Sequence, residues 1–237
     1  MQAVTVPRSE QDQTGLYRVA MGAGIGLAAA ILLIVVPVIF LLIAAYDPGG
    51  FLALDQAAFL DSTGLLVLAG ALLFLFSFFM YRRGFSQLRK VDSRFTVASL
   101  LCLIGSIGFL LILVAAIVII GSSSSVLSCV NGHASHALSC LESGEPLGAY
   151  TGLLGFWLSW VGGIGIVLGL SAASSRFKTR SIGFGAALYG ILLLVLIGPF
   201  VALLVSFPGA GAILVVAPIL SLLAPYFVFH GARPIVT

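Results

Sequence analysis

Two cysteines and two histidines lie close together in the stretch CVNGHASHALSC, which spans residues 129–140. Their order is Cys129, His133, His136 and Cys140, with three, two and three residues between successive members. Zinc takes thiolate and imidazole ligands in tetrahedral sites, so these four side chains could hold one ion. Two thiols in an oxidising compartment instead pair as a disulfide. The stretch therefore predicts either a metal site or a cystine-closed loop, depending on the compartment that it faces.

The composition of the chain points to a membrane. Of its 237 residues, 60% are hydrophobic and only 8% are charged, which leaves too little polar surface for a soluble domain of this length. A helix needs about 20 apolar residues to cross a bilayer. Six uncharged stretches are about that long, near residues 19–45, 63–81, 95–121, 148–172, 182–206 and 211–230. The expected fold class is all-α, a polytopic integral membrane protein with one domain over residues 1–237 and six transmembrane helices in three hairpins.

The positive charges predict how this domain is oriented. All eleven Lys and Arg residues fall on one side of the six spans: Arg8, Arg18, Arg82, Arg83, Arg89, Lys90, Arg94, Arg176, Lys178, Arg180 and Arg233. The opposite loops carry only acidic residues and histidine: Asp47, Asp55, Asp61, Glu142, Glu145, His133 and His136. By the positive-inside rule, both termini are cytoplasmic in a multi-pass plasma-membrane protein.

This orientation places the loop 122–147 outside the cytosol, where thiols usually pair. A Cys129–Cys140 disulfide would constrain a short loop by roughly 3 kcal/mol in the chain-entropy description. Three readings remain open: a disulfide with ordinary histidines, a disulfide beside a His133/His136 pair that binds metal or protons, and a site with four metal ligands. The spacing matches no usual zinc pattern. We expect no cofactor, and a reduced Cys102 within the third span.

The fourth span carries small residues at alternating steps of four and three. The face consists of Gly148, Gly152, Gly155, Ser159, Gly162 and Gly169, interrupted only by Ile166. Small residues let another helix approach closely, and such packing drives helix association in lipid. The partner helix could belong to this chain or to another subunit. Gly22 and Gly26 in the first span, and Gly183 and Gly190 in the fifth, are possible counterparts.

The connector after the second span combines an apolar stripe with basic residues. Phe85, Leu88, Val91 and Phe95 recur at helical spacing, and the basic residues between them are Arg82, Arg83, Arg89, Lys90 and Arg94. Such a segment could lie on the inner leaflet as a short helix, or continue the second span past the headgroups. Both readings predict that the basic residues contact inner-leaflet lipid. A solvated connector that only sets orientation is the alternative.

The same region resembles a known family. The stretch YRRGFSQL at 81–88, the DSRF that follows at 92–95, and the IGPF at 197–200 resemble an archaeal family of uncharacterised multi-span membrane proteins. The resemblance covers roughly residues 70–230. It implies an archaeal plasma membrane, and it brings no activity and no functional residues, because the family's function is unknown.

Few residues in the spans could do chemistry. The six spans contain no Asp, Glu, Lys, Arg, Asn or Gln, which argues against proton coupling through a buried carboxylate. There is no nucleophile elbow or phosphate-binding loop, so a non-catalytic protein is favoured over an enzyme. Basic residues interleaved with aromatics on a soluble surface are missing, so nucleic acid is not an expected partner.

Three functions therefore remain. The leading hypothesis is a non-catalytic membrane subunit that packs against other membrane proteins or against a second copy, with the bilayer as its other partner. The alternative is a channel or carrier for a small neutral or lipid-like solute, built on helices that are broken at Pro37, Pro199 or Pro218. The third is an outward-facing metal-binding protein or metal-dependent enzyme that uses His133 and His136.

Overall fold

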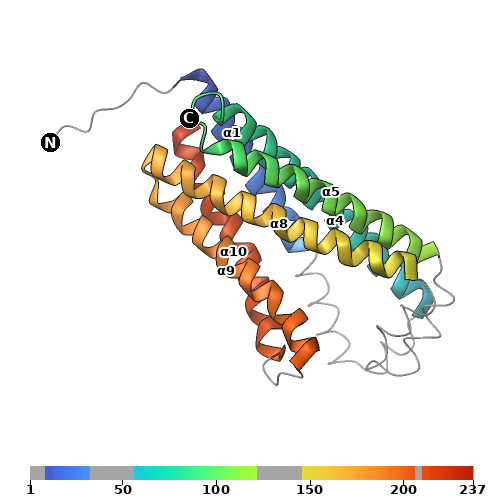
Figure 1. Cartoon of the computed structure of the whole chain (residues 1–237). Helices are drawn as coiled ribbons and strands as arrows, with labels where there is room; N and C mark the ends of the chain where they lie inside the picture. Colours follow the sequence, from blue (N-terminus) through green and yellow to red (C-terminus); the bar gives the residue numbers. More distant parts are fainter. Residues whose placement is uncertain (1–8, 33–55, 122–145, 206–209, 237) are drawn as a thin grey trace.

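The fold of the described residues is helical throughout. The structure is a computed structural model that describes residues 9–32, 56–121, 146–205 and 210–236, and these ranges contain no strand. The helices are α1 (Glu10–Ala30), α4 (Gln56–Leu88), α5 (Phe95–Gly121), α8 (Pro146–Phe177), α9 (Arg180–Val205) and α10 (Ala210–Val236) (Figure 1). The all-α prediction is thus confirmed for the described part of the chain.

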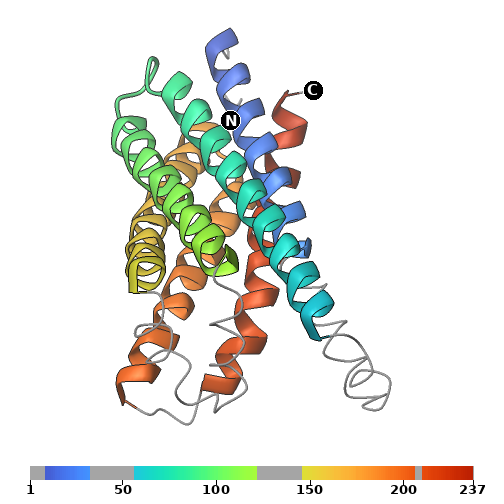
Figure 2. The same ribbon diagram turned by 90° about the vertical axis from the view of Figure 1, so that its right-hand side faces the viewer.

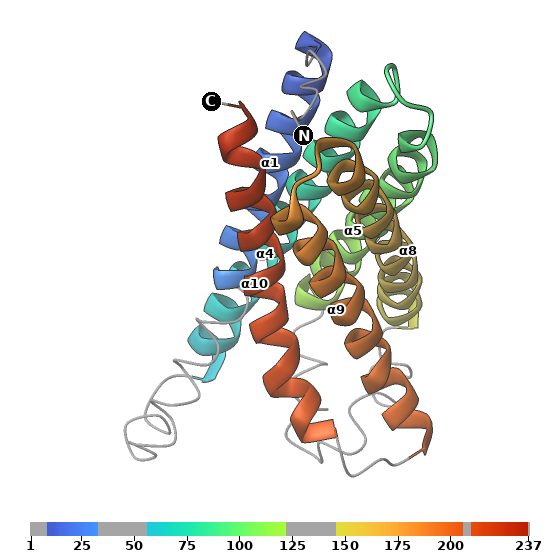
Figure 3. The same cartoon turned by 90° about the vertical axis from the view of Figure 1, so that its left-hand side faces the viewer.

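The helices form a closed ring in chain order. Each packs against the next along the chain, from α1 through α4, α5, α8 and α9 to α10, and α10 packs back against α1. The start of α1, the α4–α5 connector, the α8–α9 turn and the end of α10 gather at one end (Figures 2 and 3). We call this the basic end, because it holds the connector and turn residues Arg89, Lys90, Arg94, Lys178 and Arg180. Toward the opposite end, α4 and α9 spread apart in both views.

Three stretches of the described helices are long and apolar enough to cross a membrane: Leu68–Leu88, Phe95–Val118 and Tyr150–Phe177. Two shorter apolar stretches, Arg180–Val195 and Ile219–Ala232, lie in α9 and α10. Large aliphatic side chains cover the outside of these helices, among them Leu100 (59% exposed), Ile117 (60%) and Leu194 (69%). Because contiguous apolar surface is unfavourable in water, this exterior suits hydrocarbon.

The first helix begins earlier than the hydrophobic pattern predicts. Ser9 is its N-cap, and the Ser9 hydroxyl accepts a hydrogen bond from the Asp12 amide at 3.2 Å. Glu10 and Asp12 lie in the first turn, where acidic side chains offset the helix dipole. Arg18 therefore lies within α1 rather than before it, and the first turns of α1 belong to the basic end.

The apolar stripe of the connector faces protein, which agrees with the reading in which the second span continues as a helix and argues against the one in which the stripe lies on the inner leaflet. α4 runs straight on to Leu88, and the Asp92 amide donates to the Leu88 carbonyl at 2.9 Å in the turn that leads to α5. Phe85, Leu88 and Phe95 are fully buried, and only Val91 is exposed (40%). The periodicity was correct, but the neighbouring helices cover the apolar face, so it forms the core at the basic end.

A tight turn joins α8 to α9. Lys178 adopts the left-handed backbone conformation with φ of 52°, and the Thr179 amide donates to the Ser174 carbonyl at 3.2 Å. This is the hydrogen bond of a Schellman helix end, in which glycine usually occupies the left-handed position. The Ser174 hydroxyl donates to the Thr179 carbonyl at 3.0 Å and closes the turn from the other side.

We expect Lys178→Gly to stabilise the protein by about 1 kcal/mol, because glycine adopts the left-handed conformation without the steric cost of a Cβ. The thermal unfolding midpoint in detergent measures the effect. Lys178→Ala removes the same charge but keeps the Cβ, so it should give no gain. Equal midpoints for the two variants would contradict the assigned conformation.

Candidate functional site

The Cys/His stretch lies outside the described residues. Cys129, His133, His136 and Cys140 all fall within residues 122–145, so both the disulfide and the metal site stay predictions. Among the residues that the structure does describe, no group of three or more His, Cys, Asp or Glu side chains could hold a metal ion. Cys102 is a free, buried thiol in α5, as expected.

The small-residue face of α8 packs against α5. A Cβ added to Gly155 would lie 2.7 Å from the Gly108 carbonyl oxygen and 2.9 Å from the Ile112 nitrogen. One added to Gly105 would lie 2.7 Å from the Gly162 Cα. The two backbones therefore touch directly, and this face is already covered within the chain.

The other residues of the small-residue face of α8 have more space around them or contact groups other than the α5 backbone. Among the described residues, a Cβ on Gly152 would find only the Ala115 Cβ, at 3.4 Å, whereas one on Gly169 would strike the Phe85 ring. The Ser159 hydroxyl donates to the Gly155 carbonyl of its own helix at 2.8 Å. Gly148 is buried near the start of α8.

The expected counterparts of this face lie elsewhere. Gly22 and Gly26 pack against α4. Gly183 lies beside Ser174. A Cβ added to Gly190 would lie 4.0 Å from the nearest Val167 atom. The actual partners are Gly105 and Gly108 of α5, a pair three residues apart that could have been recognised as a small-residue face of its own.

A group of hydroxyls meets inside the ring. The Tyr81 hydroxyl lies 3.4 Å from that of Tyr189, and the two rings meet edge to face with centroids 6.4 Å apart. Tyr81 is on α4 and Tyr189 on α9, which are not neighbours in the ring, so this contact crosses its interior. Nearby, Ser77 donates to the Gly22 carbonyl at 2.7 Å. A Cβ on Gly26 would lie 3.0 Å from the Ser77 oxygen and 3.7 Å from the Tyr189 oxygen.

The tyrosine contact is loose. Hydrogen bonds between hydroxyls usually measure about 2.7–2.8 Å, so a separation of 3.4 Å is long. Each phenol can donate one hydrogen bond and accept others, and within the described ranges their mutual contact is the hydrogen bond that these two hydroxyls make. Tyr189 is also only half-buried, whereas Tyr81 is fully buried. These hydroxyls could therefore bind an uncharged hydrogen-bonding group without first breaking a strong contact.

A tryptophan side chain links α8 to α9 close to Tyr189. The Trp160 ring N–H on α8 donates to the Leu193 carbonyl on α9 at 3.0 Å. Trp157 stacks edge to face on Trp160, with centroids 6.3 Å apart, and is 41% exposed. The hydrogen bond ties α8 to α9 one turn beyond Tyr189.

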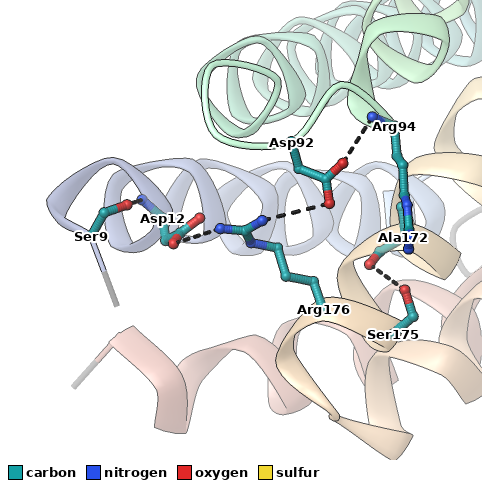
Figure 4. Close-up of polar contacts among 7 residues, drawn as sticks. All are labelled: Ser9, Asp12, Asp92, Arg94, Ala172, Ser175 and Arg176. Atoms are coloured by element: carbon teal, nitrogen blue, oxygen red, sulfur yellow. Dashed lines mark hydrogen bonds and ion pairs between the residues drawn. The ribbon is translucent and has the colours of Figure 1, made fainter. Parts of the chain in front are cut away.

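Ionic contacts cross the basic end of the ring. The Arg176 guanidinium at the end of α8 donates to Asp12 of α1, with Nη2 and Oδ2 3.1 Å apart. Its Nη1 lies 3.5 Å from Oδ2 of Asp92 in the α4–α5 connector, and Asp92 also accepts from the Arg94 amide at 3.0 Å (Figure 4). We call this set the Asp12–Arg176–Asp92 bridge. It joins three segments that are far apart in the sequence.

The side chains of the bridge are partly shielded from solvent. The Asp12 side chain is only 7% exposed, against 20% for Asp92 and 26% for Arg176. The second oxygen of Asp12, Oδ1, is buried and has no hydrogen-bond partner in the described part of the chain. Such an oxygen loses hydration without compensation, which is unfavourable.

From its place in the sequence, Arg176 was expected only to help set the orientation of the spans, and Asp12 did not stand out. The pattern Ser9-x-x-Asp12 is a helix-start signature that could have placed Asp12 in the first turn of α1. Of the residues predicted to contact inner-leaflet lipid, Arg82 is half-buried, and four are exposed: Arg83, Arg89, Lys90 and Arg94. The Arg83 guanidinium lies over the Phe79 ring, 4.4 Å from its centroid.

The chain matches no protein-family model, no curated protein and no solved structure. The resemblance to an archaeal membrane family therefore stays an expectation.

Proposed function

We propose that this chain is a six-span membrane carrier for a small neutral solute, which binds at the Tyr81–Tyr189 hydroxyls inside the ring of helices. The observation that carries the proposal is the loose hydroxyl contact across the ring interior. Two phenols from helices that do not pack together can separate to admit a solute and then hydrogen-bond to it on both sides.

The setting is a plasma membrane, archaeal if the family resemblance holds. In this arrangement α1, α4, α5, α8, α9 and α10 all cross the bilayer, and the basic end faces the cytoplasm. The exposed apolar exterior and the clustering of basic side chains at one end support it. The exposed basic residues of the connector would then contact anionic headgroups.

The chemistry of the interior favours an uncharged solute. Apart from Asp12 at the basic end and the fully buried Tyr81 hydroxyl, the buried polar side chains of the described residues are serines: Ser77, Ser99, Ser106 and Ser159. A charged solute at membrane depth needs a counter-charge, because desolvating an ion is expensive. Hydroxyls offer hydrogen bonds without such a charge, so the solute class that suits this site is a small polyol or amide.

Flux into proteoliposomes tests this function. With a panel of small neutral solutes, such as glycerol and urea, we expect uptake above that of protein-free liposomes. Tyr189→Phe removes one hydroxyl and should slow uptake about threefold to tenfold, the effect of one hydrogen bond. Tyr17→Phe is the matched control, because Tyr17 is 51% exposed on α1. No uptake across the panel, or equal losses in both variants, would contradict the proposal.

A membrane subunit is the second candidate, but it needs another surface because α5 covers the glycine face of α8. Exposed rings on α9 and α10 offer one: Phe184 (52%), Tyr226 (48%) and Phe229 (37%). Tyr226 also stacks on His230, with centroids 6.0 Å apart. Native mass spectrometry after gentle solubilisation tests this function, and a strictly monomeric species without a partner would count against it.

A further inference from the structure

We infer that the Asp12–Arg176–Asp92 bridge is a releasable latch, which holds the basic end of the ring closed and lets α1 separate from α8 when it opens. The inference rests on the proposed carrier function, since a carrier must open to each side in turn. Its own test measures opening directly and needs no solute.

The geometry shows why this contact controls closure. α1 and α8 stand on opposite sides of the ring, three places apart in either direction, and they are not packing neighbours. Arg176 spans that distance with its side chain and pairs with both Asp12 and Asp92. Losing the guanidinium therefore removes a direct ion pair between two helices that lie across the ring from each other.

The bridge closes the ring over an apolar layer. Leu16 of α1, Leu170 and Ala173 of α8, and Phe85 and Leu88 of α4 are all fully buried in one cluster at this end. Ala173 lies one turn before Arg176 on the same helix. If α1 moves away from α8, water should reach this layer first.

The balance of contacts makes the bridge releasable. Two carboxylates share one guanidinium, and one buried oxygen of Asp12 finds no hydrogen-bond partner among the described residues. In the open state that oxygen is hydrated, which offsets part of the loss of the ion pair. Arg176 and Asp92 are already partly exposed, so solvent weakens their attraction. Such opposing terms leave the closed and open states close in free energy.

Thiol labelling of the full chain in lipid nanodiscs tests the latch, because both ends of the ring then face water. The reporter is Ala173→Cys, a small change at a buried position, and Cys102 is the internal reference. A charged maleimide is added, and mass spectrometry of peptides gives the labelling rate at each site. We expect Arg176→Gln to speed labelling at position 173 about tenfold while Cys102 stays protected.

Matched variants complete the test. Arg180→Gln removes the same charge from an exposed residue at the same end and should change nothing. Asp12→Asn should speed labelling more than Asp92→Asn, since Asp12 is the closer and more buried partner. This order also decides the matter if Arg176→Gln does not accumulate.

The outcomes separate the two proposals. Unchanged labelling at position 173 in Arg176→Gln and Asp12→Asn would overturn the latch, whatever the flux assay shows. Faster labelling of Cys102 together with position 173 would also overturn it, because that result means general unfolding. A latch that opens in a protein without flux would keep the latch and remove the carrier.

Discussion

Gly162→Ala is expected to lower the thermal unfolding midpoint by about 5–10 °C. The added Cβ would lie 2.7 Å from the Phe78 ring and 2.9 Å from the Gly105 nitrogen. A ring can rotate, but a helix backbone cannot yield without moving α5 away from α8. Overpacking of this kind costs roughly 1–3 kcal/mol, and in a chain of this length each kcal/mol shifts the midpoint by about 2–4 °C.

Gly152→Ala is the matched control, because it makes the same substitution on the same helix. In the part of the chain that the structure describes, its Cβ would meet only the Ala115 Cβ at 3.4 Å, an ordinary van der Waals distance. Alanine is also the better helix former by about 1 kcal/mol. The midpoint should hold or rise. If both variants lose the same stability, α5 and α8 are not in backbone contact at Gly162.

Phe85→Ala is expected to destabilise the protein by about 3–5 kcal/mol, the usual effect of emptying a buried phenylalanine site. Phe85 is fully buried, and its ring stacks on Phe95 and Tyr81 with centroids 6.1 and 6.0 Å away. It also covers Gly169, where a side chain would collide with it. Denaturant or thermal unfolding in detergent measures the loss.

Phe76→Ala on the same helix separates the core position from a lipid-facing one. Phe76 is 55% exposed, so the surrounding lipid or detergent can fill the space that the ring leaves. We expect its effect to be well below that of Phe85→Ala. Similar losses would mean that Phe85 faces lipid, as one sequence-based reading of the connector had it.

The helices could be located from the sequence because long apolar runs leave few alternatives. The grouping of basic residues at one end followed from the same pattern. Which helices pack against one another could not be predicted from this pattern. Periodicity identifies which face of a helix is small or apolar, but any helix of the right shape can cover that face. For that reason the sequence left the partner of the α8 glycines open, and one of the readings of the connector placed Phe85 against lipid.

The polar contacts were the least predictable part of the candidate site. Asp12 and Arg176 are 164 residues apart in the chain, and neither stands out by its local pattern alone. Their pairing depends on the ring, which brings the first turn of α1 over the last turn of α8. Tyr81 and Tyr189 likewise meet only because α4 and α9 face each other. The Cys/His stretch, the most conspicuous motif in the sequence, lies outside the described residues.

The closure of α10 against α1 has a consequence for how the chain is made. Of the six described helices the ribosome releases α1 first and α10 last, so for most of synthesis the side of α1 that α10 covers lacks that neighbour. Gly24 is on that side. In the finished fold, a Cβ added to Gly24 would lie 3.5 Å from the Phe229 ring. Every other pair in the ring joins helices that follow one another among those described, and these can assemble as they emerge. Closing the ring must therefore wait for its last helix, which makes this pair the final step of assembly.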